Sequence, residues 1–246
     1  MHFLALLPYL IIGVGLVLGQ AGLRPAMLAW GVCMFGALSG LAVAITILVI
    51  GQTFSWMLAA VSIIPVAATL IMVVKDLSYP HINDVATDLD NPIAFVAALR
   101  APTNADRDMT YPETFKPQVR KAYPQIQPLI LDELADQVFE RVSHIVKNRL
   151  GWRVTHHDTR KKTVEAEAMT PLLGFVDDVI VRVSNHEGKS WVDMRSKSRE
   201  GLVDAGKNAK RIETFLEQVK QSEAGNSARS LDHSDTQFAS TQLRRS

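Results

Sequence analysis

The sequence has few of the residues on which redox, metal and nucleophilic chemistry usually depend. Its one cysteine, Cys33, lies inside an apolar run. A single cysteine cannot form an internal disulfide or a thiolate metal site, and a lone buried thiol usually acts as a small hydrophobic side chain. The histidines show no metal-ligand spacing, and no serine stands in a nucleophile-elbow motif. We therefore expect no metal and no cofactor, and we name no catalytic residue.

Charge is almost missing from the first third of the chain. Before Lys75, the one residue of the Asp, Glu, Lys and Arg types is Arg24. With Arg24 set aside, the rest of the chain carries 25 basic and 25 acidic residues. This balance argues against nucleic acid as a partner, because phosphate binding requires a basic excess.

Three long apolar runs fill the uncharged third, at residues 3–19, 26–50 and 54–74. A bilayer core about 30 Å thick requires roughly 20 apolar residues of helix. The sequence therefore predicts a bundle of three transmembrane helices within residues 1–76, with the lipid bilayer as a partner. The runs contain no intramembrane charges of the kind that transporters use, so we expect no transport function.

Two glycine pairs stand at helical spacing in these runs, Gly15 with Gly19 and Gly36 with Gly40. Small residues four apart let helices approach closely, although glycine is also common in membrane helices in general. Three spans place the Arg24 turn and the chain after Lys75 on the same side of the membrane. The positive-inside rule makes that side the cytoplasm.

The remaining sequence predicts a soluble α+β domain over residues 77–220. Residues 79–101 indicate a loop or a short edge strand, and prolines between residues 111 and 128 indicate extended chain. Apolar spacing predicts a helix from Leu131 to about Arg149, and Asp204 is a plausible N-cap for a last helix. Strands are predicted at 152–157, 162–169, 175–184 and 190–198. This order predicts an antiparallel four-stranded sheet flanked by two helices on one face.

The chain after residue 220 is polar, and we predict that residues 221–246 form a disordered tail.

Four stretches resemble the family called domain of unknown function 1499. They are residues 82–92, 111–112, 173–178 and 193–212. The family has no assigned reaction, so the resemblance implies a cellular location but no chemistry. Because its members are envelope or thylakoid-lumen proteins, the resemblance implies a multi-pass protein of the bacterial inner membrane with a periplasmic domain. This implication opposes the charge rule, and we favour the periplasm.

The last two predicted strands and the last predicted helix carry polar residues that we expect to form a cluster. Its candidate members are Asp177, Asp178, Arg195, Ser196, Ser198, Arg199, Asp204, Asn208 and Arg211. Consecutive strand residues point to opposite faces, and Asp177 shares its face with valines. A carboxylate pointing at the core needs a cation or hydrogen-bond donors. The cluster is either a ligand-binding or acid/base site, or a buried ion-pair network between sheet and helix, and we favour the network.

The basic run 195–199, followed by Gly201 and the helix start at Asp204, could bind an anion. Asp204 as N-cap would already use those donors, and the basic strand face could instead pair with Glu165 and Glu167. His156 and His157 are expected in a solvated hairpin bend.

We expect a membrane-anchored envelope protein that binds a small ligand or a membrane-protein partner without catalysis. The alternative is an envelope hydrolase that uses Asp177 or Asp178 with Arg195. A third hypothesis is a component of a membrane complex, with Gly36 and Gly40 at a helix interface.

Overall fold

Three long helices form the first third of the computed structural model, which describes residues 2–22, 25–50, 55–149 and 151–222. They are α1 (His2–Gln20), α2 (Ala26–Ile50) and α3 (Ser55–Asp76). All three are long and apolar enough to cross a membrane. Large apolar side chains cover their outer surfaces, which suits hydrocarbon but not water. The chain is therefore anchored in a membrane.

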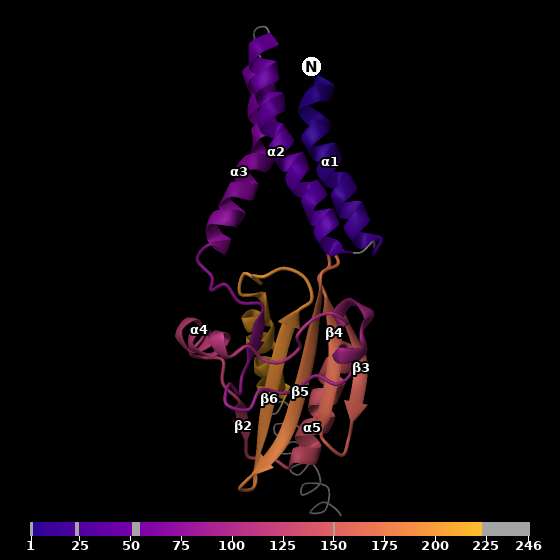
Figure 1. Cartoon of the computed structure of the whole chain (residues 1–246), viewed down its shortest axis with the longest axis vertical. Helices are drawn as coiled ribbons and strands as arrows, with labels where there is room; N and C mark the ends of the chain where they lie inside the picture. Colours follow the sequence, from indigo (N-terminus) through magenta and orange to yellow (C-terminus); the bar gives the residue numbers. More distant parts are fainter. Residues whose placement is uncertain (1, 23–24, 51–54, 150, 223–246) are drawn as a thin grey trace, which may run out of the picture.

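Glycines allow the three helices to pack closely (Figure 1). A Cβ on Gly15 would lie 2.5 Å from Cys33 Sγ, and one on Gly36 would lie 2.9 Å from Ile12 Cγ1. A Cβ on Gly40 would collide with the carbonyl oxygen of Ser62. The glycine spacing read from the sequence therefore serves contacts within this chain, α1 with α2 and α2 with α3.

The two halves of α3 have different surroundings. Ala59, Ser62 and Pro65 of its first half are buried against the bundle. From Ala67 to Asp76 no residue is buried. Figure 1 shows why, because α3 diverges from α1 and α2 as it approaches the soluble domain.

The domain that follows contains one antiparallel sheet of six strands. They are β1 (Asp84–Ala86), β2 (Leu129–Leu131), β3 (Trp152–Asp158), β4 (Thr163–Met169), β5 (Val176–His186) and β6 (Lys189–Ser198). Five strands follow the order β1-β6-β5-β4-β3, and β2 also pairs with β6. The four predicted strands are β3 to β6, so the prediction of a four-stranded sheet is wrong by two. β1 and β2 share the outer edge of β6, and three residues are too few to show an alternating pattern.

The helices of the domain also differ in part from the prediction. α5 (Ala135–Asn148) begins later than predicted, because Leu131 belongs to β2. The stretch predicted as extended chain contains the 3₁₀ turn η3 (Glu113–Phe115) and α4 (Lys116–Ala122). Pro117 stands in the first turn of α4, where its missing N–H is not needed. The last helix spans 207–222, so residues 221–222 of the predicted tail are helical, and residues 223–246 lie outside the described residues.

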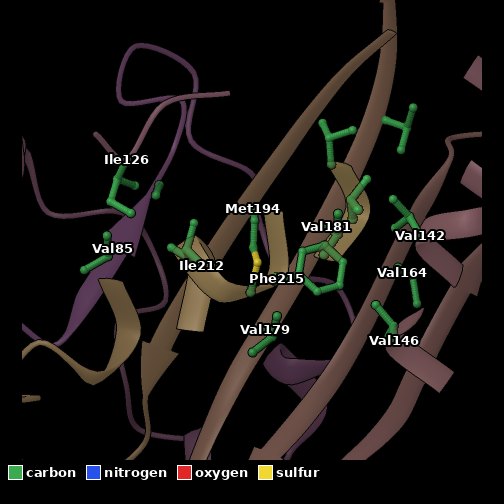
Figure 2. Close-up of a cluster of buried hydrophobic side chains, with 14 of the residues drawn as sticks. Val85, Ile126, Val142, Val146, Val164, Val179, Val181, Met194, Ile212 and Phe215 are labelled. Carbon is green, nitrogen blue, oxygen red and sulfur yellow. The ribbon is translucent and has the colours of Figure 1, made fainter. Parts of the chain in front are cut away.

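The main core lies between the sheet and two helices, α5 and the helix at 207–222. Figure 2 shows Val179, Val181 and Met194 of the central strands meeting Ile212 and Phe215 of the last helix. α5 contributes buried valines from its amphipathic face. Complete burial of one such side chain contributes about 1.5–3 kcal/mol.

The opposite face of the sheet is covered by irregular chain. Residues 87–110, with the 3₁₀ turns η1 (Ala98–Arg100) and η2 (Pro102–Asn104), cross it, as Figure 1 shows. A smaller apolar cluster forms there from Ile93, Phe95, Ala98, Met109 and Ile180. The sheet therefore has a helix layer on one face and a loop layer on the other.

Candidate functional site

Five of the predicted polar residues meet on the helix-covered face. Arg211 of the last helix donates to Asp177 of β5, and its Nη1 donates to Ser196 Oγ at 2.9 Å. Asn208 Oδ1 accepts from Ser196 Oγ at 2.7 Å, and Asn208 Nδ2 donates to Ser198 Oγ at 3.0 Å. These contacts join the last helix to β5 and β6. Each side chain in this cluster has at least one hydrogen-bond partner, as a buried network requires.

Asp204 fixes the turn that leads into the last helix. Its carboxylate accepts the N–H of Gly206 at 3.0 Å and that of Asn208 at 2.8 Å. Burial raises the pKa of Asp204 in spite of these two hydrogen bonds, which lower it. The donors that an anion would need at this turn are therefore occupied by the chain's own carboxylate.

A second polar cluster lies on the loop-covered face, around Asp84 of β1. Arg195, which is 1% exposed, donates Nε to Asp84 Oδ1 at 3.0 Å and Nη2 to Oδ2 at 2.7 Å. Lys197 Nζ donates to the same Oδ2 at 3.1 Å. The guanidinium carbon of Arg195 lies 4.7 Å from the ring centre of Phe95 and 5.3 Å from that of Tyr111. One carboxylate thus pairs with two buried cations, and no local pattern in the sequence predicts these contacts across more than 100 residues.

The other strand carboxylate, Asp178, pairs with Arg199 on the loop face. Arg199 Nη2 lies 2.6 Å from Asp178 Oδ1 and 2.6 Å from Glu167 Oε1. Asn104 of η2 donates to Asp178 Oδ2 at 2.8 Å. Burial alone would raise the pKa of Glu167, but hydrogen bonds from Arg199 and Arg153 hold it below its usual value.

Backbone groups of the loop layer take part in the same network. Glu165, a candidate partner of the basic strand, instead accepts the N–H groups of Val96, Ala97 and Ala98 at 2.6, 3.0 and 3.1 Å. Arg195 donates to the carbonyl of Ile93 at 2.9 Å. It donates to that of Met109 at the same distance. The charged side chains of the sheet therefore satisfy the polar backbone of the segment that covers them.

The nine predicted site residues thus divide between two separate places. Asp177, Ser196, Ser198, Asn208 and Arg211 form the helix-side cluster, next to the Asp204 cap. Asp178, Arg195 and Arg199 lie on the opposite face of the sheet. Arg195 pairs with Asp84 and with neither carboxylate of the predicted Asp177 and Asp178 pair.

The two histidines lie in the strand predicted at 152–157 and not in a bend. His156 and His157 belong to β3 and pair with Glu165 and Val164 of β4, so the strand prediction is confirmed and the expectation of a solvated hairpin bend at these residues is wrong. His157 Nε2 lies 3.0 Å from Ser143 Oγ of α5. Among the residues that the structure describes, no three His, Cys, Asp or Glu side chains are grouped to hold a metal ion.

The domain is held against the membrane helices by backbone contacts. The Glu200 carboxylate accepts the N–H of Ala26 at 3.1 Å and that of Met27 at 2.9 Å, and so caps the N-terminus of α2. At the end of α1, a Cβ on Gly19 would lie 2.8 Å from the Cα of Leu173. A larger residue at Gly19 would force the β4–β5 loop away from the bundle.

A cavity of about 510 Å³ lies at a further junction, where the end of α3 meets the start of the last helix. We call it the junction cavity. Its principal lining residues are Met72, Lys75, Tyr79, Tyr123, Gly206 and Lys207. These come from α3, from the chain that follows it, from the end of α4 and from the Asp204 turn, so the topology assembles the cavity from distant segments.

Tyr123 is the unusual group in the junction cavity. Its side chain is buried, with 9% of the residue exposed, and its hydroxyl has no hydrogen-bond partner among the described residues. Burial, with the nearby Asp204 carboxylate adding to it, raises the pKa of Tyr123 to about 12. Gly206, at φ +74°, leaves the space beside the hydroxyl open, because a Cβ there would lie 3.4 Å from the Tyr123 oxygen and 2.5 Å from the Tyr79 ring. Sequence patterns did not single out either tyrosine, because both stand in irregular chain near prolines.

No curated protein matches this chain. A family model described as "Protein of unknown function (DUF1499)" matches residues 84–219, more than half of the sequence. The match begins at the first residue of β1 and ends within the last helix, so it contains both polar clusters. The resemblance read from the sequence is confirmed, and the chain belongs to the DUF1499 family.

Proposed function

We propose that this protein is a membrane-anchored, non-catalytic binding module and that the junction cavity is its ligand site. The buried, unpaired hydroxyl of Tyr123 beside this cavity carries the proposal. Buried polar atoms are nearly always hydrogen-bonded, and leaving one unpaired costs about 1–3 kcal/mol. A ligand that supplies the missing partner would offset this cost, whereas a purely structural tyrosine gains nothing from its hydroxyl.

The helix-side polar cluster has a supporting role in this proposal. Asp204 and Asn208 hold the turn that positions Gly206 and Lys207 at the cavity. The Asp177 and Arg211 pair fixes the helix on which these residues stand. Preorganisation of this kind lowers the entropy that binding must overcome.

The hydrolase alternative gains no supporting observation. Asp177 and Asp178 each hold an arginine on opposite faces of the sheet, and Arg195 is bound to Asp84. A general acid or base must reach its substrate within hydrogen-bonding distance. These groups are instead hydrogen-bonded to their own partners.

For location, we propose the inner membrane of a bacterium, with the soluble domain in the periplasm. The family resemblance supports this side of the membrane, whereas Arg24 and Lys75 favour the other. Fusion of two reporters to the C-terminus distinguishes the two sides. A phosphatase that folds only in the periplasm should be active, and a cytoplasmic fluorescent protein should be dark. The reverse pattern would place the domain in the cytoplasm.

The ligand site is tested by filling the cavity in the cell. Gln125 is exposed and lines the junction cavity, while Gln127 is exposed two residues away and does not. We propose that the module supports the integrity of the envelope, so a strain that lacks it should be sensitive to detergent. In that strain we expect Gln127→Trp to restore detergent resistance and Gln125→Trp to fail, at equal protein levels. Equal rescue by both variants would remove the junction cavity as the functional site.

A further inference from the structure

The bilayer has an apolar path to the junction cavity along α3. Met72, which lines the cavity, is 65% exposed, and Ile71 and Val74 beside it are exposed to the same degree. In Figure 1 this half of α3 stands apart from α1 and α2. A hydrocarbon chain from the adjoining leaflet can therefore lie along this surface and reach the cavity without crossing polar groups.

Three lysines line the cavity, and two of them come from different elements. Lys75 stands in the last turn of α3, and Lys207 stands in the first turn of the last helix. Neither has an ion-pair partner among the described residues, whereas the neighbouring Lys210 is bound to Glu213 at 2.8 Å. Asp76 and Glu213 also border the cavity, so its charge is mixed. Within the described part of the chain, the lining cations without an ion-pair partner are Lys75 and Lys207.

An apolar wall, two ammonium groups without ion-pair partners and a buried hydroxyl together form a lining that fits an amphiphile with an anionic head. Building on the proposed function, we propose that the junction cavity binds one anionic phospholipid of the adjoining leaflet. Its phosphate lies between Lys75 and Lys207, the Tyr123 hydroxyl donates to a headgroup oxygen, and an acyl chain follows α3 past Met72.

A free phosphate ion fits these observations less well than a lipid. The volume of about 510 Å³ lies in the range of cavities that hold a whole small molecule. Met72, an exposed apolar residue of the membrane-spanning helix α3, lines the cavity, and a hydrated ion would gain nothing from contact with it. Lysines close to a membrane surface also attract anionic lipid in particular.

The test measures which lipid the full chain retains. The protein is reconstituted in nanodiscs of phosphatidylcholine with a minor share of phosphatidylglycerol, released into mild detergent, and weighed with its bound lipid by native mass spectrometry. We expect one phosphatidylglycerol to be retained in preference to phosphatidylcholine. Each lysine near a membrane surface contributes about five-fold, so Lys75→Gln with Lys207→Gln should lower this preference about thirty-fold.

A matched control separates local binding from net charge. Lys161 stands in the turn between β3 and β4 and Lys220 stands in the last helix, and both are exposed and do not line the junction cavity. Lys161→Gln with Lys220→Gln removes the same charge and should leave the preference unchanged. Equal loss in both double variants, or equal retention of the two lipids by the natural chain, would overturn the proposal.

Tyr123→Phe supplies an independent readout. It removes an unpaired buried hydroxyl, so the lipid-free protein in detergent should unfold at the same or a higher urea concentration, while phosphatidylglycerol retention falls several-fold. Unchanged retention would exclude the hydroxyl from the headgroup contact.

Two further arms distinguish the ligand class from the site. If inorganic phosphate displaces the lipid, the site recognises the ion rather than the amphiphile, and the lipid assignment is overturned. If Gln125→Trp abolishes rescue in the cell but no variant alters lipid retention, the proposed function stands and the ligand is of another class. If Gln125→Trp abolishes retention but still rescues, lipid binding stands and the functional role fails.

Discussion

On one face of the sheet, Val179, Val181 and Met194 pack against the last helix and α5. One residue further along each strand, Ile180, Arg195 and their neighbours face the loop layer, where charged side chains replace most of the apolar ones. Both faces are covered, and most side chains on both are buried. The difference lies in the segment that covers each face.

A helix satisfies its own backbone, so the sheet face that it covers need not supply backbone partners and can be largely apolar. The polar cluster around Asp177 on that face binds side chains of the last helix instead. Irregular chain leaves N–H and C=O groups without partners, and the sheet must supply them. Glu165 accepts three N–H groups of the loop layer, and Arg195 donates to two of its carbonyls. The buried charges of the loop-covered face therefore follow from the secondary structure of its cover.

The largest expected effect comes from removing the shared anion of the loop-covered face. Asp84→Ala leaves Arg195 and Lys197 buried without a counter-charge, and we expect a loss of about 3–5 kcal/mol in the free energy of unfolding. Hydrogen exchange of the β6 amides in the detergent-solubilised chain measures it. The control, Asp90→Ala, breaks an exposed pair with Arg120 and should cost less than about 1 kcal/mol.

A triple variant sharpens the comparison. Asp84→Leu, Arg195→Met and Lys197→Met together remove the charges and restore an apolar interior, a replacement that is often neutral for simple ion pairs. Here we expect incomplete recovery, because the carbonyls of Ile93 and Met109 lose their donor. Full recovery would show that the backbone of the loop layer does not need the charges.

The matching change on the helix-covered face is Phe215→Ala. The Phe215 ring is completely buried and stacks on Trp152 at 5.9 Å between ring centres. Its loss leaves a cavity and should lower the free energy of unfolding by about 3 kcal/mol. The same exchange measurement applies, and Leu202→Ala, at an 86% exposed position, serves as the control. A cost near zero would mean that the core collapses around the missing ring.

The long elements could be predicted because each carries a strong local pattern, which is a continuous apolar run for the three membrane helices and an alternation for the long strands. The three apolar runs and β3 to β6 lie within a few residues of their predicted bounds. The opposed directions of Asp177 and Asp178 also followed from strand geometry alone. The choice of partners did not follow, because Arg195, Arg199 and Arg211 were equal candidates until the topology placed each one.

The features that the sequence did not predict depend on contacts between residues far apart in the sequence and not on a local pattern. β1 and β2 form because β6 has a free edge, and Asp84 meets Arg195 across that edge. The junction cavity combines α3, Tyr123 and Gly206, which stand far apart in the sequence. Only Gly206 carried a local signal, since a glycine just before a helix start indicates a turn with positive φ.

The smallest expected effect is a pair of opposite pH dependences. The pKa of Glu167 is lowered in the folded state, so its contribution is present above its unfolded value of about 4.3 and is lost as the pH falls through the folded pKa. The pKa of Asp204 is raised, so its contribution is present below about 3.9 and is lost as the pH rises through the folded pKa. We therefore expect Glu167→Gln to weaken the loss of unfolding free energy between pH 5 and pH 3, by roughly 1 kcal/mol or less. Asp204→Asn, which keeps a capping side chain, should steepen it, and unfolding free energies across that range that shift in the same direction for both variants would contradict the assignment.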